Sequence, residues 1–488
     1  MSDTQTSYSV FDDLGFKPYL DHAYAEIQAL YLENDRPWVI GYSGGKDSTA
    51  VVQLIWQALA KLPVEQRTKP VHVITTDTLV ENPVVVAWVT RSLKLMDIRA
   101  ESESMPFRSH PLTPLFRDSF WVNLIGRGYP TPRAKFRWCT ERLKIMPSNK
   151  FILSMVSQHG EALLALGTRK AESQMRARTM EKHEQRRTRA RLSPNSHIDN
   201  CLIYTPIEDW SNDDVWLFLT RTENPWGLGN TELLDLYKDA TEDRECPLIV
   251  NLEATTPSCG ASRFGCWVCT LVSRDRSLEA MVANDPANQW LKPLLGFRSQ
   301  LCVKDDKKMR DFRRARGQVQ LFHDEALHGP YLQAQREIFL RELLKAEQEM
   351  QRNAPVEFQP FSLIRIEELR EIRRIWLTEK HEIEDRLPKI YAEVTGKPYP
   401  EPSMGYYHCF GEEQLKLLEE VCDGDRLGYE MVRELVDIEW SYRTKLRRAG
   451  LLTRLEEGIR RSYYEDEQDA VAFAREQQLG KAPEERQA

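Results

Sequence analysis

The chain has 488 residues, of which 41% are hydrophobic and 29% charged, so it can bury the cores of two or three domains. Its formal charge of -7 argues against a protein that binds nucleic acid over its whole surface, and leaves that role to local patches or partner proteins. No apolar stretch approaches the roughly 20 residues of a membrane span. Because residues 1–21 are polar and lack a signal-like pattern, we expect a cytoplasmic protein without a membrane partner.

Strand-like and helix-like segments alternate from residue 38 onward. An apolar run over residues 38–42 precedes a helical pattern over residues 48–62. A second strand is predicted over residues 71–74, followed by a helix that begins at Pro83, and a third strand over residues 162–166. This alternation predicts an α/β fold with a doubly wound parallel sheet, whose ligands bind beyond the carboxyl ends of the strands.

The composition changes along the chain and predicts four regions. Residues 1–35 are expected to form an N-terminal helical extension, and residues 36–300 the α/β domain. Residues 301–463 carry apolar side chains at helical spacing between charged ones, which predicts an all-helical C-terminal domain. Residues 464–488 are acidic with few large apolar side chains, so we predict a disordered tail.

A phosphate-binding loop is predicted directly after the first strand, where the sequence reads Ser43-Gly44-Gly45-Lys46-Asp47-Ser48-Thr49. Two glycines let backbone amides approach an anion, and the serines, the lysine and the start of a helix add donors and positive charge. It is not a Walker A loop, because Ile40 stands at the place of that motif's first glycine and Asp47 follows the lysine. The alternative is an ordinary glycine turn before a helix.

The order Ser-Gly-Gly-Lys-Asp-Ser resembles the pyrophosphate loop of the ATP pyrophosphatase superfamily, whose fold is that of the adenine nucleotide alpha hydrolases. The resemblance implies that ATP is cleaved between its α and β phosphates. AMP passes to a substrate oxygen while residues 43–49 hold the pyrophosphate. Lys46 and Asp47 are then expected to be catalytic.

A second motif follows the third strand. Its sequence, Gly167-Thr168-Arg169-Lys170-Ala171-Glu172-Ser173-Gln174-Met175-Arg176, resembles the Gly-x-Arg-x-x-Glu-Ser-x-x-Arg segment of phosphoadenosine phosphosulfate reductases, which belong to the same superfamily. Arg169 and Arg176 are suited to clamping phosphate oxygens. The resemblance implies that Gly167 and Glu172 also line the nucleotide site, with Arg169 catalytic.

Two further positions are open to more than one interpretation. Asp77, after the second strand, is either a contact to Mg²⁺ or ribose, or a turn former. The segment 206–216 resembles the part of the reductases that follows, but Ser211 is a good helix N-cap, and we interpret this segment as support for the fold.

Three of the nine cysteines lie within the eleven residues from Cys259 through Cys266 to Cys269. An odd number of cysteines at uneven spacing argues against a disulfide framework. This spacing alone favours a zinc site and a [4Fe–4S] cluster about equally, and either needs a fourth ligand. Cys139 resembles the cysteine that begins cluster ligation in sulfonucleotide reductases, and Cys246 is the reserve candidate.

These motifs, together with His328-Gly329-Pro330-Tyr331, resemble the sulfurtransferases of bacterial DNA phosphorothioation, the Dnd C-type family. The resemblance implies a [4Fe–4S] cluster on Cys139, Cys259, Cys266 and Cys269, and the use of ATP and Mg²⁺. It implies adenylylation of a DNA backbone phosphate oxygen, followed by its replacement with sulfur from a cysteine desulfurase. DNA, the desulfurase and other Dnd-system proteins would be the partners.

Locally basic segments offer a path for such a polyanion. Basic residues outnumber acidic ones in residues 127–144, 169–191 and 304–316, and DNA bound by such segments would dissociate readily in salt. The commoner meaning of a charge run is a solvated face. We favour that meaning for residues 304–316.

Three alternatives compete with DNA phosphorothioation. A sulfonucleotide reductase should carry a Glu-Cys-Gly type motif near its C-terminus, and no cysteine follows Cys422. A tRNA thiolase would use the same loop with another acceptor. A non-catalytic DNA-binding scaffold of a defence system would not depend on Lys46.

Overall fold

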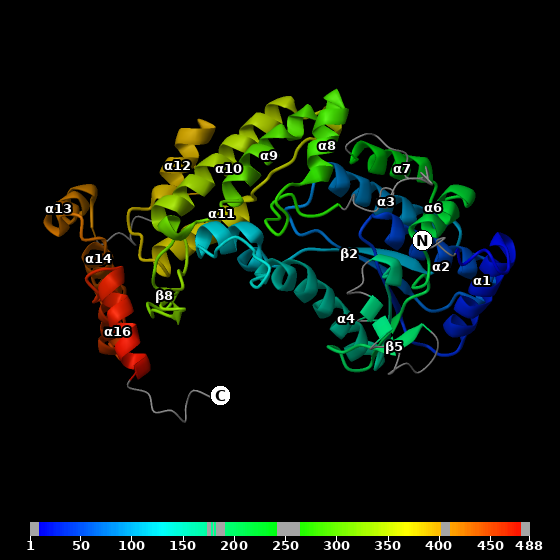
Figure 1. Ribbon diagram of the computed structural model, residues 1–488, viewed down its shortest axis with the longest axis horizontal. Helices are drawn as coiled ribbons and strands as arrows, with labels where there is room; N and C mark the ends of the chain where they lie inside the picture. The colour runs from blue at the N-terminus through cyan, green and yellow to red at the C-terminus, as the bar shows by residue number, and fades with distance from the viewer. Residues whose placement is uncertain are drawn as a thin grey trace, which may run out of the picture. The chain divides into compact units, whose positions relative to one another are not determined.

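The computed structural model describes residues 9–172, 177–178, 180–181, 191–241, 264–401 and 410–479. The chain divides into two compact units (Figure 1). The first, here called the sheet unit, comprises residues 1–115, 136–295 and 355–359. The second, here called the helical unit, comprises residues 116–135, 296–354 and 360–488.

The sheet unit is built on a six-stranded sheet with the strand order β3-β2-β1-β4-β6-β5. All neighbours are parallel except β5, which runs antiparallel to β6. In the register of the central strand, Ile40 pairs with Val73 on one side and with Ala165 on the other. The expected α/β fold with a mostly parallel sheet is confirmed. The strands are β1 (Trp38–Gly41), β2 (Val71–Thr76), β3 (Phe107–Leu112), β4 (Ala162–Ala165), β5 (Leu192–Pro194) and β6 (Cys201–Tyr204).

Alternate residues of the central strands face two different cores, because successive side chains of a strand point to opposite faces. Trp38 and Ile40 belong to a core with α1, α2 and α3, whereas Val39 belongs to a core with α4. Helices therefore cover both faces of the sheet (Figure 1). The helices of this unit are α1 (Phe16–Leu32), α2 (Lys46–Ala60), α3 (Pro83–Ser102), α4 (Met146–His159), α6 (Asn212–Arg221), α7 (Asn230–Asp239) and α8 (Arg276–Asn284), and α9 (Lys292–Leu301) reaches the unit boundary.

Two helix starts follow the signals read in the sequence. Asn82 caps α3 by accepting a hydrogen bond from the amide of Val84, and Pro83 occupies the first helical position. Ser211 caps α6 in a capping box with Asp214, as expected for fold support. The observed helices begin slightly earlier or extend further than predicted, since α2 starts at Lys46 and α3 continues to Ser102.

The helical unit consists mainly of helices, as predicted. They are α10 (Gln333–Asn353), α11 (Ile366–Thr378), α12 (Arg386–Thr395), α13 (Glu412–Cys422), α14 (Arg426–Tyr442), α15 (Leu451–Ser462) and α16 (Glu467–Leu479). The prediction that it is all-helical is wrong in one place, because β7 (Leu321–Phe322) and β8 (Glu325–Ala326) form a small antiparallel hairpin. His323 and Asp324 at its turn both have positive φ, as the central residues of a type I′ hairpin turn require.

Ion pairs join the helices of this unit at the loop between α11 and α12. Glu382 pairs with Arg336 of α10, and both side chains are buried. Glu384 pairs with Arg433 of α14 at 2.7 Å. A buried carboxylate is tolerable only when it is paired or hydrogen-bonded, so these contacts couple the loop to the surrounding helices.

Two predicted boundaries differ from the observed organisation. Residues 116–135, expected in the α/β domain, belong to the helical unit, where Trp121 donates from Nε1 to the carbonyl of Leu363 at 2.6 Å. Residues 467–479, expected to be disordered, form α16, whose Ala470 is fully buried beside Phe312. The prediction of disorder therefore does not hold for this stretch. Among the described helices, none has the length and apolarity to cross a bilayer.

Helix α1 should be integral to the sheet unit, because Ile27 is fully buried in the core that α1 shares with α2. We expect Ile27→Ala to lower the free energy of unfolding by about 2–5 kcal/mol, from lost apolar burial and the cavity that remains. Urea denaturation measures this. Ile98→Ala on α3 is the matched control, since Ile98 is 54% exposed, and its effect should stay within about 0.5 kcal/mol. Equal losses would show that α1 is not packed as described.

Candidate nucleotide site

The strand order reverses at β1, which pairs with β2 on one side and with β4 on the other. In open α/β sheets a crevice forms at such a switch point, beyond the carboxyl ends of the strands. The segment after β1 is the predicted phosphate loop, and the segment after β4 begins with Gly167. The fold therefore brings both motifs to the place where doubly wound proteins bind ligands.

The phosphate loop is held by its own hydroxyl groups and by a glycine in a left-handed conformation. The Ser43 amide donates to Ser48 Oγ at 3.1 Å, and Ser48 Oγ donates to the Gly45 carbonyl at 3.0 Å. Gly44 has φ +75°, and a Cβ there would lie 2.4 Å from Val89 Cγ2. Only glycine fits that position. Thr49 is fully buried in the first turn of α2, where its amide donates to the Gly45 carbonyl.

Lys46 is the first residue of α2, and only 7% of it is exposed. Its Nζ lies 3.3 Å from the carboxylate of Asp47. Burial lowers the pKa of Lys46, and the negative charge of Asp47 opposes that shift. A partly desolvated cation at the N-terminus of a helix is an arrangement that favours binding of an anion.

Arg169 connects the two motifs. Its Nε lies 2.7 Å from Asp47 Oδ1, and its Nη1 donates to the Trp210 carbonyl at 3.1 Å. The Arg169 side chain is almost fully buried, whereas that of Asp47 is 24% exposed. An arginine fixed at two points keeps its remaining donors in a defined direction, which suits it to phosphate oxygens.

The backbone of Gly167, after β4, packs against the backbone of Asp47 in the phosphate loop. A Cβ on Gly167 would lie 2.9 Å from the Asp47 carbonyl carbon and oxygen, so only glycine allows this approach. Glu172 accepts a hydrogen bond from the Arg169 amide at 3.2 Å. The structure therefore brings together residues 43–49, Gly167, Arg169 and Glu172, while Arg176 lies outside the described residues.

Asp77 has an observed local role. Its Oδ1 accepts a hydrogen bond from the Leu79 amide at 2.8 Å, and Leu79 adopts a positive φ of 66°. These contacts shape the turn after β2, which is one of the two roles considered for Asp77.

The Cys266–Cys269 loop is attached to the chain just after β2. Trp267 donates its amide to the Val80 carbonyl at 3.1 Å, and the Cys269 amide donates to the Cys266 carbonyl at 3.0 Å. The Cys266 thiol lies 3.4 Å from Thr78 Oγ1 and 3.5 Å from Glu81 Oε1. Burial raises the pKa of Cys266 to about 12, and the negative charge of Glu81 adds to the shift. In the absence of a metal, the thiol therefore stays protonated.

Cys139 lies near the same loop. Burial raises its pKa, a hydrogen bond with the Thr140 hydroxyl lowers it, and the charge of Cys269 raises it again. The influence of Cys269 on the Cys139 thiol indicates that these two cysteines of the predicted thiolate set lie in the same region of the sheet unit. Cys259 and the reserve Cys246 lie outside the described residues, and within the described ranges no three ligand side chains converge closely enough to hold a metal ion.

Several residues at the site were not found by sequence analysis. Thr78 and Glu81 contact Cys266, and Lys144 pairs with Glu81 at 3.2 Å. Tyr237 of α7 accepts a hydrogen bond from the Lys46 amide at 3.2 Å. Glu81 follows Thr78 by three residues, and this spacing could have indicated that both side chains belong to one turn. Nothing in the sequence near Tyr237 indicates that it contacts the phosphate loop.

The basic segments have partners in the structure. Lys170 pairs with Asp209 and Arg191 with Glu26, both within the sheet unit. In the segment 304–316, Arg313 pairs with Asp311 at 2.7 Å and with Glu430 at 2.6 Å. The segment 304–316 therefore contributes to the packing of the helical unit through Arg313.

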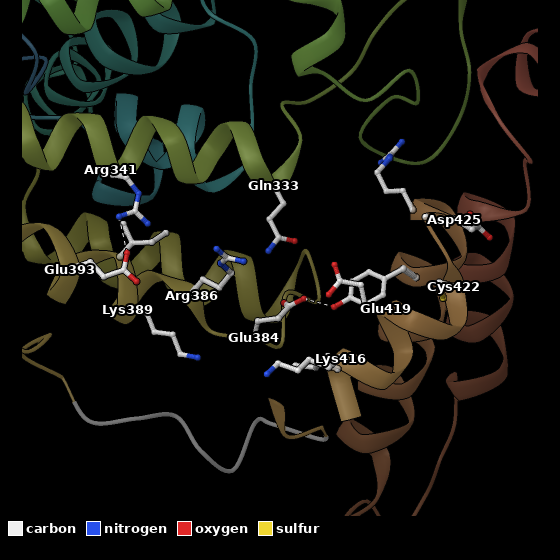
Figure 2. A pocket seen from close by; sticks show the side chains of 15 residues that line it. Gln333, Arg341, Glu384, Arg386, Lys389, Glu393, Lys416, Glu419, Cys422 and Asp425 are labelled. Carbon is white, nitrogen blue, oxygen red and sulfur yellow. Dashed lines mark hydrogen bonds and ion pairs between the residues drawn. The ribbon is translucent and has the colours of Figure 1, made fainter. Parts of the chain in front are cut away.

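The helical unit contains a cavity of its own, of about 650 Å³, between α10, α12, α13 and α14. Figure 2 shows Arg386, Lys389 and Lys416 among the side chains that line it. Acidic side chains accompany the basic ones, since Arg341 pairs with Glu393 at 2.7 Å. No residue of the predicted nucleotide site lines this cavity.

Residues 37–272 match the protein family described as the phosphoadenosine phosphosulfate reductase domain. Over these residues, slightly less than half of the chain, the sequence is similar to phosphoadenosine phosphosulfate reductase domains. An uncharacterised protein of Methanocaldococcus jannaschii is 28% identical over 211 residues, which are 43% of this chain and 36% of that protein. The match therefore spans about a third of the length of that curated relative.

Similar solved structures include the phosphoadenylyl-sulfate reductase of Candida auris in complex with phosphate. It is 15% identical and has a TM-score of 0.26, over 42% of this chain and 86% of that one. The U34-tRNA thiolase of Methanococcus maripaludis with its [4Fe–4S] cluster is 13% identical and has a TM-score of 0.25, over 60% of this chain and 82% of that one. At such TM-scores neither likeness bears on what this chain binds.

The close approach of Gly167 to Asp47 gives a test of the site geometry. Gly167→Ala should place a methyl group against the Asp47 backbone and lower the free energy of unfolding by about 1–3 kcal/mol. Gly296→Ala is the control, because a Cβ there meets nothing within 4 Å and alanine favours a helix. Thermal denaturation of both variants measures the difference. An unchanged midpoint for Gly167→Ala would contradict the observed approach.

Proposed function

We propose that this protein is an ATP pyrophosphatase-type sulfurtransferase that replaces an oxygen of a DNA backbone phosphate with sulfur. The contact between Asp47 and Arg169 at 2.7 Å carries the proposal, because it joins the phosphate loop to the second motif at the switch point of the sheet. The match of residues 37–272 to the reductase-like domain supports the nucleotide chemistry.

In the first step, an acceptor phosphate oxygen attacks the α-phosphorus of ATP, and the bond between that phosphorus and the bridging oxygen breaks. AMP is then joined to the acceptor, and pyrophosphate leaves with the electron pair. Negative charge builds up on the leaving oxygens, so Lys46, Arg169 and the amides of residues 43–49 lower the barrier electrostatically. Mg²⁺, when bound to the phosphates, neutralises part of the same charge. An ionised phosphate oxygen needs no general base.

In the second step, a sulfur nucleophile attacks the activated acceptor phosphorus, and AMP leaves with the oxygen that had attacked ATP. If the sulfur arrives as a persulfide, its outer sulfur bonds to phosphorus while it is still bonded to the inner sulfur. A further thiol then attacks the inner sulfur, so the sulfur–sulfur bond breaks, the outer sulfur stays on phosphorus, and a new disulfide forms. The cysteine desulfurase of the implied Dnd C-type system is the proposed sulfur donor.

Cys139, Cys259, Cys266 and Cys269 are the residues proposed to hold a [4Fe–4S] cluster. When bound, such a cluster supplies either redox chemistry or a structural brace at the end of the sheet. Cys266 and Cys269 share a loop that is bonded to the chain after β2, and Cys269 influences the Cys139 thiol, which supports this donor set. Since burial raises the pKa of Cys139 and Cys266, metal binding there would release thiol protons.

The choice of DNA as acceptor rests on the Dnd C-type resemblance and on the basic segments 127–144 and 169–191, which contain proposed site residues. A sulfonucleotide reductase is the second candidate, because the family match names that activity. Mass spectrometry of host DNA with and without the protein decides between them, since only the DNA enzyme leaves phosphorothioate dinucleotides. Comparing tRNA and duplex DNA as stimulants of pyrophosphate release tests the tRNA thiolase alternative.

Lys46→Ala should abolish most ATP-dependent pyrophosphate release, because the variant lacks the cation that faces the leaving phosphates. Loss of one such electrostatic group typically lowers kcat by about 100- to 1,000-fold. Pyrophosphate is measured by a coupled enzymatic assay with the acceptor and the sulfur donor present.

The control for this variant is Lys61→Ala, just beyond the C-terminal end of α2. Lys61 is 52% exposed and pairs with Asp21, away from the loop. Its activity should equal that of the wild type. DNA phosphorothioation that persists in Lys46→Ala would instead favour a non-catalytic scaffold.

Cys266→Ser should remove most of the iron and the visible absorbance near 400 nm from protein purified without oxygen. A serine hydroxyl is a poor replacement for a thiolate ligand. Cys422→Ser is the control, because Cys422 lies in the helical unit. Iron content and the visible absorption spectrum are measured for both variants. Unchanged iron in Cys266→Ser would rule out the proposed cluster.

A further inference from the structure

Tyr237 of α7 reaches the phosphate loop from outside both sequence motifs. Its hydroxyl accepts a hydrogen bond from the Lys46 amide at 3.2 Å. A Cβ on Gly45 would lie 3.1 Å from the same oxygen, so the phenol lies directly against the loop backbone. The Lys46 ammonium lies 5.5 Å from the centre of the Tyr237 ring. The Tyr237 side chain thus lies against Gly45 and Lys46, two residues proposed to bind phosphate.

The ring of Tyr237 is fixed by its neighbours. Only 5% of the residue is exposed, and the ring makes edge contacts with Trp216 at 5.2 Å and Phe264 at 4.8 Å between centroids. A ring held in this way keeps its hydroxyl at one place. Burial raises the pKa of Tyr237, the Lys46 amide opposes this shift, and the charge of Asp47 adds to it. The phenol therefore keeps its proton at neutral pH.

That proton has no acceptor among the described residues, although the oxygen already accepts the Lys46 amide. Tyr31 shows the usual arrangement for a buried tyrosine. Its hydroxyl accepts the Lys69 amide at 3.0 Å and also donates to the Lys69 carbonyl at 2.7 Å. Buried hydroxyl groups normally find a partner. The donor of Tyr237 is therefore available to a ligand in the loop.

We propose that Tyr237 is a further pyrophosphate-binding residue, which passes a hydrogen bond from the Lys46 amide through its hydroxyl to an oxygen of the leaving pyrophosphate. The role rests on the proposed function, because it requires the loop to hold pyrophosphate. Such a chain of donors polarises each member, and hydrogen bonds to charged groups are the stronger ones. The phenol then contributes to the charge stabilisation already assigned to Lys46 and Arg169.

The opposite role would be competition, in which the hydroxyl blocks the Lys46 amide and has to leave before pyrophosphate binds. The two roles predict opposite effects of removing the hydroxyl. A donor makes Tyr237→Phe bind pyrophosphate more weakly, whereas a competitor makes it bind more tightly.

The test measures binding of inorganic pyrophosphate and of AMP to the full-length protein by isothermal titration calorimetry. Tyr237→Phe should weaken pyrophosphate binding by about 10- to 100-fold, the range for a lost hydrogen bond to a charged group. AMP binding should stay within about twofold, because the hydroxyl is proposed to touch only the leaving part of the nucleotide. A variant that disturbs the loop structure would weaken both ligands.

Tyr31→Phe is the matched control, since it removes a buried hydroxyl that also accepts an amide, but away from the loop. It should bind pyrophosphate as the wild type does. Unchanged or tighter pyrophosphate binding by Tyr237→Phe, with binding lost in Lys46→Ala, would overturn the role of Tyr237 alone. A wild-type protein that binds neither ATP nor pyrophosphate would overturn the proposed function itself.

Discussion

The contact between Asp47 and Arg169 is the constraint on which the site depends. Asp47 lies in the first turn of the helix after β1, and Arg169 follows β4, so their 2.7 Å contact spans the switch point of the sheet. Gly167 makes it possible, because any larger residue would separate the two segments. The contact leaves Asp47 partly exposed and Arg169 anchored to the Trp210 carbonyl. The loop and the arginine are therefore arranged before a ligand arrives, which lowers the cost of binding.

Much of the fold could be predicted because the central strands are short, continuous apolar runs. β1, β2 and β4 are buried on both faces, and this produces the signal that the sequence analysis used. β3 was missed because it lies at the edge of the sheet, contains Pro111, and carries the polar side chains of Arg108 and His110. Residues 116–135 were misassigned because no local pattern records that Trp121 bonds to Leu363, far along the chain.

The two phosphate motifs could be found from sequence because their chemistry is contained in contiguous residues. The two motifs lie side by side because β1 and β4 are neighbours in the sheet. The sequence predicts this only indirectly, through the alternation of strands and helices. Tyr237 could not be found in this way, since it lies on a helix far along the chain and meets the loop only through the fold, where its hydroxyl accepts a hydrogen bond from the Lys46 amide. The tail was misjudged for a similar reason. Its composition is polar, but Ala470 is fully buried beside Phe312 and stabilises α16.

The attachment of the Cys266–Cys269 loop fixes its distance from the phosphate loop. The loop bonds to Val80 and Glu81, just after β2, while the phosphate loop follows β1, and these strands are hydrogen-bonded neighbours. The spacing between the two loops is therefore a property of strand register. A slip of one residue between β1 and β2 would displace the proposed cluster ligands relative to the proposed pyrophosphate-binding residues.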